Sequence, residues 1–319
     1  MVSVALPVRN GAPHLEAVLH AVRAQRLDAP LEIVAIDSGS TDGSLEILRS
    51  HGVRIQEIAH SDFSHGGTRN ALMELAGGEY VAFLTQDAEP VDDRWLTRLL
   101  EGFALSRDVG LTCGPYRPRP GASVPVRREL ETWFASFTAG GNPRVDRSDN
   151  RSPHPGPATF FSSANGCVAR AAWTRVPFRP VPYAEDQRLA VDMLHAGFAK
   201  VFLPEAEVWH SHEYAPLDGF RRVFDEFRAL SEVYGHRESL APRPVIGRIR
   251  REVSLDRRWA RRAGTGGERL DVDTLRSLRY HSLRAVAAGV GTRAADLPPG
   301  LRRVLSLERR STFLPTHLP

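Results

Sequence analysis

Residues 31–43 read LEIVAIDSGSTDG, an apolar run of strand length that ends in an acid and a series of small polar residues. A segment with helical spacing follows at 43–50, and the alternation of strand and helix continues on both sides of it. Such alternation is typical of an α/β protein with a mixed, mostly parallel sheet flanked by helices. Strands are predicted at 2–7, 31–36, 53–58, 80–84 and 109–116, and helices at 14–25, 43–50, 67–76 and 95–105.

The alternation stops at residue 117, where a proline-rich stretch runs to residue 158. One helical segment within it, 126–137, carries Trp133 and Phe137, and we interpret the stretch as an excursion over the rim of the sheet. We expect one α/β domain over 1–214 and a basic helical extension over 215–319. The remaining strands are predicted at 159–170 and 200–209, and the remaining helices at 185–196, 217–234 and 272–288.

The chain has 319 residues, of which 42 are basic and 38 acidic, and Lys200 is its only lysine. A P-loop needs a lysine directly after its glycines, so that class of nucleotide site is excluded, and Schiff-base chemistry would have to use Lys200, which lacks a motif. Positive charge gathers in 215–319, where 21 arginines accompany 12 acidic residues, while 1–214 has a net charge of −5. This asymmetry indicates either an anionic partner, such as phosphate, lipid headgroups or nucleic acid, or a helical surface covered with salt bridges.

The number of cysteines and the hydropathy of the chain indicate the cellular compartment in which the protein works. Cys113 and Cys167 are the only cysteines, too few for a disulfide framework or a zinc site. No apolar run approaches the ~18 residues of a membrane span, and the first residues lack the basic segment of a signal peptide. We expect a cytoplasmic protein. An apolar helical stripe indicates either core packing or a peripheral contact with the inner face of the cell membrane; it consists of Phe220, Val223, Phe224, Phe227 and Leu230.

Polar residues follow the predicted strands, at the edge of the sheet where α/β proteins bind ligands. Arg9 and Asn10 follow the first strand, Asp37 follows the second, and Asp87 follows the fourth. An acid followed by small residues suits recognition of a nucleotide, although the polar residues after Asp37 could equally serve only as a helix cap. The carboxylate of Asp87 could hold a hard divalent cation that bridges two phosphates.

Three further segments complete the candidate site. Gly66 and Gly67 open a helix, which favours phosphate binding, and Arg69 could add a charge-assisted hydrogen bond. His210 and His212 are spaced to point the same way from a strand, and imidazole suits ions such as Mn²⁺. Glu185 and Asp186 begin a helix, where they could be dipole partners or supply a general base whose pKa the helix end depresses.

In this order, the motifs resemble those of glycosyltransferase family 2, which has the GT-A fold. The resemblance covers about residues 2–215. It rests on 7–10 (PVRN), 37–43 (DSGSTDG), 68–70 (TRN), Asp87, 185–186 (ED) and a C-terminal histidine. Within the family, 65–70 (HGGTRN), 85–88 (TQDA) and 210–212 (HSH) resemble the rhamnosyltransferase subgroup. Two departures are that Thr85 replaces the first acid of the Asp-x-Asp element and Ser38 replaces the second acid after the second strand.

The resemblance implies an inverting transferase that moves a sugar from a nucleoside-diphosphate sugar, with dTDP-rhamnose as the leading donor, to an acceptor hydroxyl. The acceptor would be a lipid-linked glycan or a small molecule. Asp186, with Glu185, would be the catalytic base, and Asp87, with His210 or His212, would hold Mn²⁺ or Mg²⁺. The donor site would comprise Pro7, Val8, Arg9, Asn10, Asp37, Gly67, Arg69, Gln86 and Asp87, and the acceptor site Trp133, Phe137 and Asn165.

Two other functions compete with this interpretation. A sugar-1-phosphate nucleotidyltransferase would also use an α/β nucleotide domain, but it needs a lysine beside the first strand. A nucleic-acid-binding protein could use the basic extension, which however lacks the aromatic, zinc-binding or helix-turn-helix signatures of such proteins, so we expect no nucleic-acid partner. Residues 279–314 resemble the C-terminal segment of the rhamnosyltransferase subgroup, which predicts that they pack on the catalytic domain or form a homodimer contact.

Overall fold

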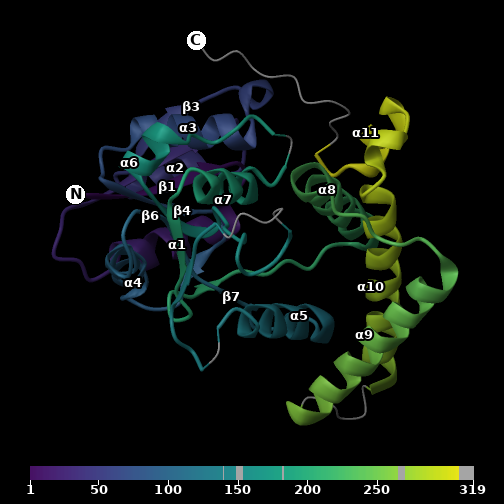
Figure 1. The fold of residues 1–319 in the computed structure, drawn as a ribbon. Coiled ribbons are helices and arrows are strands. Elements are labelled where there is room, and N and C mark those ends of the chain that lie inside the picture. Colours follow the sequence, from purple (N-terminus) through teal and green to yellow (C-terminus); the bar gives the residue numbers. More distant parts are fainter. Residues whose placement is uncertain (139, 149–153, 182, 265–269, 309–319) are drawn as a thin grey trace.

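The computed structural model describes residues 1–138, 140–148, 154–181, 183–264 and 270–308 (Figure 1). Its centre is an eight-stranded sheet in the order β3-β2-β1-β4-β9-β6-β10-β8. Most neighbours are parallel, whereas β9 runs antiparallel to β4 and β6, and β8 runs antiparallel to β10. The predicted fold class is therefore confirmed. The strands are β1 (Val2–Val8), β2 (Leu31–Asp37), β3 (Arg54–Glu57), β4 (Tyr80–Leu84), β6 (Val109–Cys113), β8 (Arg144–Asp146), β9 (Asn165–Ala169) and β10 (Ala199–Phe202).

Helices cover both faces of the sheet (Figure 1). One face packs on α1 (Ala12–Arg23), α2 (Ser44–Ser50) and α4 (Trp95–Glu101), and the other on α3 (His65–Leu75), α6 (Arg170–Arg175) and α7 (Glu185–His195). In α1 the residues that share one helical stripe, Leu15, Val18, Leu19 and Val22, are all buried, as the sequence spacing predicts. Short 3₁₀ helices lie at η1 (His60–Asp62), η2 (Gly102–Ala104) and η3 (Ala294–Asp296).

Two predicted strands are each broken in two. Residues 109–116 form β6 and then β7 (Tyr116–Arg117), and residues 200–209 form β10 and then β11 (Val208–Trp209). With β5 (Glu89–Pro90), the two short pieces make a second sheet in the order β5-β11-β7. Gly114 permits this break because an added Cβ would lie 1.8 Å from the carbonyl oxygen of Ala206. The second sheet matters for function because it ends beside Asp87 and His210.

A third predicted strand, at 159–170, is also too long, since only β9 at its end is extended. The helix predicted at 126–137 is α5 (Val124–Ala135), which lies at the rim of the sheet as expected for the excursion (Figure 1).

The C-terminal extension is helical, as predicted, but contains two helices that were not predicted. The predicted helices are α8 (Pro216–Tyr234) and α10 (Leu270–Gly291), and the missed ones are the long α9 (Pro242–Arg262) and the short α11 (Pro299–Leu305). Buried ion pairs hold α9 against α5: Arg128 Nη2 lies 2.8 Å from Glu252 Oε2, and Arg128 Nε also pairs with Asp256. His281 Nε2 of α10 lies 2.7 Å from the same Asp256. Val245, Ile249 and Val253 recur every four residues on the half-buried face of α9, a helical pattern that the sequence prediction missed.

Part of the positive charge of the basic extension is neutralised within the chain. Several of its arginines form ion pairs within the chain, such as Arg284 with Glu226 at 3.4 Å and Arg276 with Glu213 at 3.0 Å. The extension also packs on residues 1–214, as predicted for 279–314, because α10 contacts α5 (residues 309–314 lie outside the described part).

The apolar stripe of α8 faces inward. Phe224 is fully buried and the other four members are half-buried. The stripe therefore packs largely against other parts of the protein. Within the described ranges, no helix is both long and apolar enough to cross a membrane.

The single lysine has a structural role. Lys200 is 1% exposed, and its Nζ lies 2.8 Å from Asp146 Oδ2 and 3.1 Å from the carbonyl oxygen of Pro157. We expect Lys200→Met to lower the free energy of unfolding by roughly 2 kcal/mol, because it leaves Asp146 buried with only Arg144 as its partner. Thermal unfolding of Lys200→Met beside the solvent-exposed variant Arg107→Met checks this, and equal melting temperatures would contradict it.

Candidate active site

Asp87 and two histidines converge at the edge of the second sheet. Asp87 precedes β5 and His210 follows β11, and these strands pair through Glu89 and Trp209. Asp87 Oδ1 lies 3.6 Å from His210 Nδ1, and Asp87 Oδ2 lies 3.4 Å from His212 Nε2. The structure thus brings together the three residues predicted to bind a metal.

The same three side chains fit a divalent cation. Burial lowers the pKa of His210 to about 4 and also lowers the pKa of His212, so both imidazoles are neutral at pH 7 and can offer lone pairs. His210 Nδ1 is buried and has no hydrogen-bond partner among the described residues. One donor atom from each side chain lies within 4.8 Å of the other two. Carboxylate and imidazole together suit Mn²⁺ better than they suit an oxygen-only ion.

Glu185 and Asp186 open α7 after a backbone turn of unusual conformation. Ala184 has a φ of +58°, in the left-handed region that residues with a side chain rarely adopt. Asp186 Oδ2 accepts a hydrogen bond of 3.1 Å from the N–H of Ser163, and Oδ1 accepts one of 2.8 Å from the N–H of Gln187. The turn and these two bonds fix the direction of the carboxylate.

The pKa of Asp186 moves opposite to the sequence prediction. Burial and the adjacent charge of Glu185 raise it to about 6, and they outweigh the opposing effects of Arg69 and of the two N–H groups. The predicted depression by the helix end is therefore wrong. The raised pKa of Asp186 suits a general base, because a carboxylate with a pKa near 6 accepts a proton more readily than an ordinary aspartate and is still ionised at pH 7.

Arg69 holds Glu185 and does not face open space. Its Nη1 lies 2.9 Å from Glu185 Oε1, and both side chains are almost fully buried. Arg69 is therefore used in this buried ion pair and is not placed to contact a pyrophosphate, contrary to the sequence prediction. Gly66 has a packing role, since an added Cβ would lie 2.2 Å from the carbonyl oxygen of Arg179, while Gly67 is half-buried in the first turn of α3.

The ends of β1, β2 and β4 are tied together by the residues predicted to bind the nucleotide. Arg9 N–H donates to Gln86 Oε1 at 2.7 Å, and Gln86 Nε2 donates back to the carbonyl oxygen of Arg9 at 2.9 Å. Asn10 Oδ1 accepts from the N–H of Thr41 at 2.8 Å. Pro7 and Val8 are the last residues of β1, half-buried and buried respectively.

Asp37 is buried and is used by its own loop. It is 1% exposed, and its Oδ1 accepts hydrogen bonds from the N–H groups of Gly39 and Ser40 at 3.0 and 2.9 Å. Its carboxylate therefore shapes the loop after β2, and the predicted direct contact with a base is not available in this arrangement.

A cavity of about 750 Å³ adjoins the histidines, a volume typical of ligand sites. It extends from His210 and His212 to α5, α8 and α10, and Trp133 lines it with 41% of its surface exposed. Tyr116 connects the two halves of the site: its ring lies edge-on to His210, with centroids 4.9 Å apart, and its hydroxyl bonds to Ser162, which precedes the Ser163 N–H that holds Asp186.

Two predictions for the acceptor site are wrong. Phe137 is 2% exposed and packs behind Trp133, with ring centroids 5.1 Å apart. Asn165 is fully buried, where it accepts from Trp95 Nε1 at 2.7 Å and donates to the carbonyl oxygens of Pro115 and Ala206 at 2.9 and 2.8 Å. Neither side chain has surface left for an acceptor.

Arg222 lines the cavity from α8 and was not among the residues predicted for the site. Its guanidinium lies 4.7 Å from the ring centroid of Tyr183, and no carboxylate of the described residues lies within ion-pair distance of it. No local motif surrounds Arg222. Only its place beside the apolar stripe could have drawn attention to it.

Comparison with known proteins agrees with the fold and the motifs. The family model described as "Glycosyl transferase family 2" matches residues 3–166, more than half of the chain. The O-antigen chain rhamnosyltransferase WbaN of Salmonella anatum is 33% identical over 214 residues, which are 65% of this chain and 64% of that protein. The O-antigen chain rhamnosyltransferase RfbN of Salmonella typhimurium is 28% identical over 228 residues, 70% of each chain. The chain thus spans slightly less than two thirds of the first of these relatives.

Two solved structures share the fold at low sequence identity. The mannosyltransferase PcManGT from Pyrobaculum calidifontis, in complex with GDP-Man and Mn²⁺, superposes with a TM-score of 0.59 at 16% identity, covering 91% of this chain and 86% of that one. Glucosyl-3-phosphoglycerate synthase from Mycobacterium tuberculosis, in complex with Mn²⁺, UDP and phosphoglyceric acid, gives a TM-score of 0.52 at 18% identity, covering 75% and 80%. By its match to the family description, which agrees with the motifs at its strand ends, the chain belongs to glycosyl transferase family 2.

Proposed function

We propose that this protein transfers a sugar from a nucleoside-diphosphate sugar to an acceptor hydroxyl with inversion at the anomeric carbon. One observation carries the proposal: a carboxylate with a raised pKa and a carboxylate–imidazole cluster are joined through Tyr116 beside one cavity. Similarity to two O-antigen rhamnosyltransferases supports rhamnose as the sugar and dTDP-rhamnose as the donor.

Asp186 would accept the proton of the acceptor hydroxyl as that oxygen attacks the anomeric carbon. The Ser163 N–H fixes its Oδ2, and Arg69 keeps the neighbouring Glu185 turned aside in an ion pair. The raised pKa of Asp186 lies closer to the pKa of the acceptor hydroxyl, and the smaller difference favours proton transfer in the transition state.

Asp87, His210 and His212 would hold a divalent cation, Mn²⁺ or Mg²⁺. When bound, such an ion neutralises the negative charge that develops on the departing nucleoside diphosphate. The solved structures in complex with Mn²⁺ support a cation in this fold.

Arg222 would contribute a second positive charge to the leaving group. Burial opposes the charge of Arg222, but Tyr183, Tyr214, Glu308 and Glu226 together raise its pKa, and its guanidinium lines the cavity without a direct ion pair among the described residues, so it can contact an anion there. We expect Arg222→Gln to weaken binding of the nucleoside diphosphate by about 10-fold to 100-fold, the usual worth of a hydrogen bond to a charged group. Calorimetric titration with dTDP measures this, and Arg221→Gln on the same helix, where Arg221 pairs with Asp218 at 3.5 Å, is the matched control. Equal affinities in the two variants would remove Arg222 from the site.

The acceptor would enter the cavity between α5 and α10. Trp133 offers an apolar ring face of the kind on which sugars pack, and Glu129 and Tyr280, 2.9 Å apart, line the same space. A lipid-linked glycan or a small molecule both fit this description. The competing assignments, a nucleotidyltransferase and a nucleic-acid-binding protein, are not favoured by the relatives.

The pH dependence follows from the raised pKa of Asp186. Protonated Asp186 cannot accept the acceptor proton, so kcat should fall tenfold per pH unit below about 6 and level off above it. An unperturbed aspartate would place this limb near pH 4. A pH profile of kcat at saturating metal and donor checks this; a plateau that continues unchanged to pH 5 would contradict the proposed base.

The direct test of the proposed function is a screen of nucleotide sugars. The purified protein is incubated with Mn²⁺ and each of dTDP-rhamnose, UDP-glucose and GDP-mannose, and release of the nucleoside diphosphate is measured. We expect the largest release with dTDP-rhamnose. Release of the nucleoside diphosphate from another donor would support a transferase that uses a different sugar. If no donor released its nucleoside diphosphate and no donor bound, the proposal would be overturned.

A further inference from the structure

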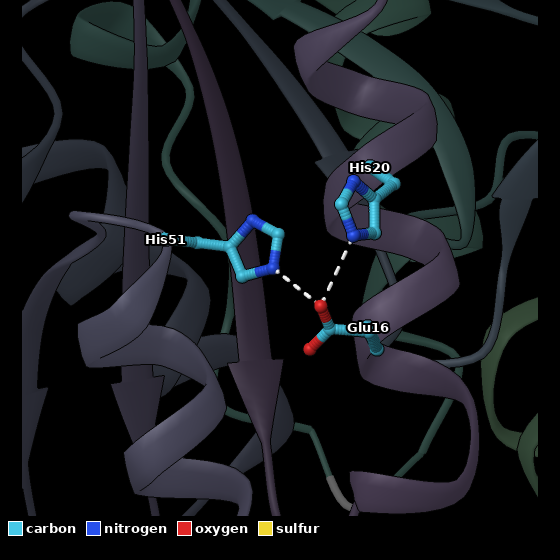
Figure 2. A group of neighbouring side chains, drawn as sticks. All are labelled: Glu16, His20 and His51. Carbon is cyan, nitrogen blue, oxygen red and sulfur yellow. Dashed lines mark hydrogen bonds and ion pairs between the residues drawn. The ribbon is translucent and has the colours of Figure 1, made fainter.

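A second group of metal-ligating side chains lies outside the candidate active site (Figure 2). Glu16 and His20 stand one turn apart on α1, and His51 follows the end of α2. His20 Nε2 lies 3.1 Å from Glu16 Oε1, and His51 Nε2 lies 2.9 Å from the same oxygen. The two rings meet edge to face with centroids 4.9 Å apart. Two imidazole nitrogens and one carboxylate oxygen thus converge on one point, as Figure 2 shows.

The topology separates this group from the crevice. Helices α1 and α2 both begin after the carboxyl ends of their strands, beside the loops of Asn10 and Asp37, and run back along the sheet. His20 belongs to the last turn of α1, and His51 is the C-cap residue of α2. The group therefore lies toward the opposite edge of the sheet, and a ligand bound there would not share residues with Asp87, His210 or His212.

We propose that Glu16, His20 and His51 form a binding site for a divalent transition-metal ion of borderline softness, with Zn²⁺ as the representative ion. Two histidines and a glutamate are a known Zn²⁺ ligand set that leaves a fourth position for water. Ligands about 2.0–2.2 Å from a tetrahedral ion stand roughly 3.3–3.6 Å apart. The present separations of 2.9 and 3.1 Å need to widen by only a few tenths of an ångström.

The surroundings favour both entry of the ion and orientation of the ligands. The side chains of His20 and Glu16 are 70% and 53% exposed, so water and an ion reach them, while that of His51 is only 12% exposed and is held by its neighbours. Arg23 contributes to this by donating a hydrogen bond of 2.8 Å to the carbonyl oxygen of His51. On binding, each ring would carry its proton on Nδ1 and direct the lone pair of Nε2 to the ion.

Such an ion would tie the end of α1 to the end of α2. The opposite ends of the two helices are already connected, since the N–H of Gly11 donates to Ser44 Oγ at 2.9 Å and the N–H of Ala12 donates to Asp42 Oδ2 at 3.0 Å. A bound ion would therefore fix both ends of the helix pair that carries the loops after β1 and β2.

The test counts Zn²⁺ equivalents by equilibrium dialysis and elemental analysis at pH 7.5. His20→Ala removes an exposed ligand with little risk to folding, and His195→Ala removes an exposed histidine from the last turn of α7 as the matched control. Wild type and His195→Ala should bind one more equivalent than His20→Ala, whose affinity at this site should fall about 100-fold or more. Glu16→Gln should behave like His20→Ala. In Asp87→Ala, which lacks a ligand of the candidate active site, adding His20→Ala should remove one further equivalent.

Two results would overturn the proposal. The first is equal Zn²⁺ stoichiometry and affinity in wild type, His20→Ala and Glu16→Gln. The second is equal Zn²⁺ binding by Asp87→Ala and by the double variant Asp87→Ala/His20→Ala, which would assign every bound ion to the candidate active site. Circular dichroism of metal-free His20→Ala shows whether the variant is folded, and if it is not, Glu16→Gln alone decides. The proposal does not depend on the transferase function, so each can fail without the other.

Discussion

Asp186→Asn should reduce kcat for sugar transfer by about 10²–10⁴-fold, the usual contribution of a positioned general base. Asparagine keeps the shape of the side chain and can still accept the hydrogen bond from the N–H of Ser163, while its NH2 group cannot accept the one from the N–H of Gln187. Binding of the nucleoside diphosphate should therefore be nearly unchanged. Steady-state kinetics and calorimetric titration with dTDP, both with Mn²⁺ present, separate the two quantities.

The same substitution should stabilise the protein at neutral pH. The pKa of Asp186 in the folded protein, about 6, lies above the value of 3.8 expected for the unfolded chain. Its contribution to stability is therefore fully present below pH ~4 and is lost as the pH rises through about 6, because ionising the buried carboxyl is unfavourable. Asn removes that cost, which we expect to raise the free energy of unfolding at pH 7.5 by on the order of 1–2 kcal/mol.

Asp192→Asn, on the same helix, is the matched control. Asp192 is almost fully buried and pairs with Arg179 at 2.7 Å and with Arg188 at 3.1 Å. Its replacement should lower the melting temperature and leave kcat close to that of the wild type, the reverse of both effects expected for Asp186→Asn. If the two variants lost turnover equally, the loss would reflect damage to α7 and Asp186 would not be the base.

Much of the fold follows from the sequence because its signals are local. The spacing of Leu15, Val18 and Leu19 predicts a helix with one buried face, and the acids after β2 and β4 lie where an α/β sheet binds ligands. These features depend on neighbours within a few residues. The grouping of Asp87 with His210 could also be anticipated, although more than a hundred residues separate them, because both follow strands.

Other features depend on contacts that a single sequence does not reveal. The ion pairs that join α9 to α5 link Arg128 with Glu252 and Asp256, more than a hundred residues away, and no local pattern predicts such pairs. The pKa of Asp186 is set mainly by burial and by Glu185, whereas the helix end alone suggests a lowered pKa. Asn165 is the first residue of β9, and its amide joins Trp95, Pro115 and Ala206 inside the protein.

The partners of the individual arginines are equally non-local. Arg69 lies next to a glycine pair and looks suited to phosphate, yet it pairs with Glu185, which is far away in the sequence. Arg222 lies beside an apolar stripe, yet it forms no direct ion pair with a carboxylate of the described residues and lines the cavity. A sequence shows that arginines are abundant, but only the fold shows which of them are neutralised.

Asp87→Ala should abolish metal-dependent binding of the nucleotide. In the wild type, Mn²⁺ should strengthen binding of dTDP, because the cation offsets the charge repulsion between the carboxylate of Asp87 and the diphosphate. In Asp87→Ala we expect the affinity measured with Mn²⁺ to fall about 100-fold or more, to the value measured with a chelator present. Calorimetric titrations with and without Mn²⁺ measure both values.

Variants of the two histidines then show how the cation is held. His210 is the more buried ring, and its Nδ1, 3.6 Å from Asp87, has no other partner in the described structure, so His210→Ala should match Asp87→Ala. His212 is 37% exposed and stacks on Tyr214 with centroids 5.3 Å apart, so water can replace its nitrogen and the loss should be smaller. His236→Ala, which removes a histidine bonded to Glu238 far from Asp87, is the control and should bind like the wild type. Unchanged Mn²⁺-dependent affinity in Asp87→Ala and His210→Ala would show that these residues do not hold the ion.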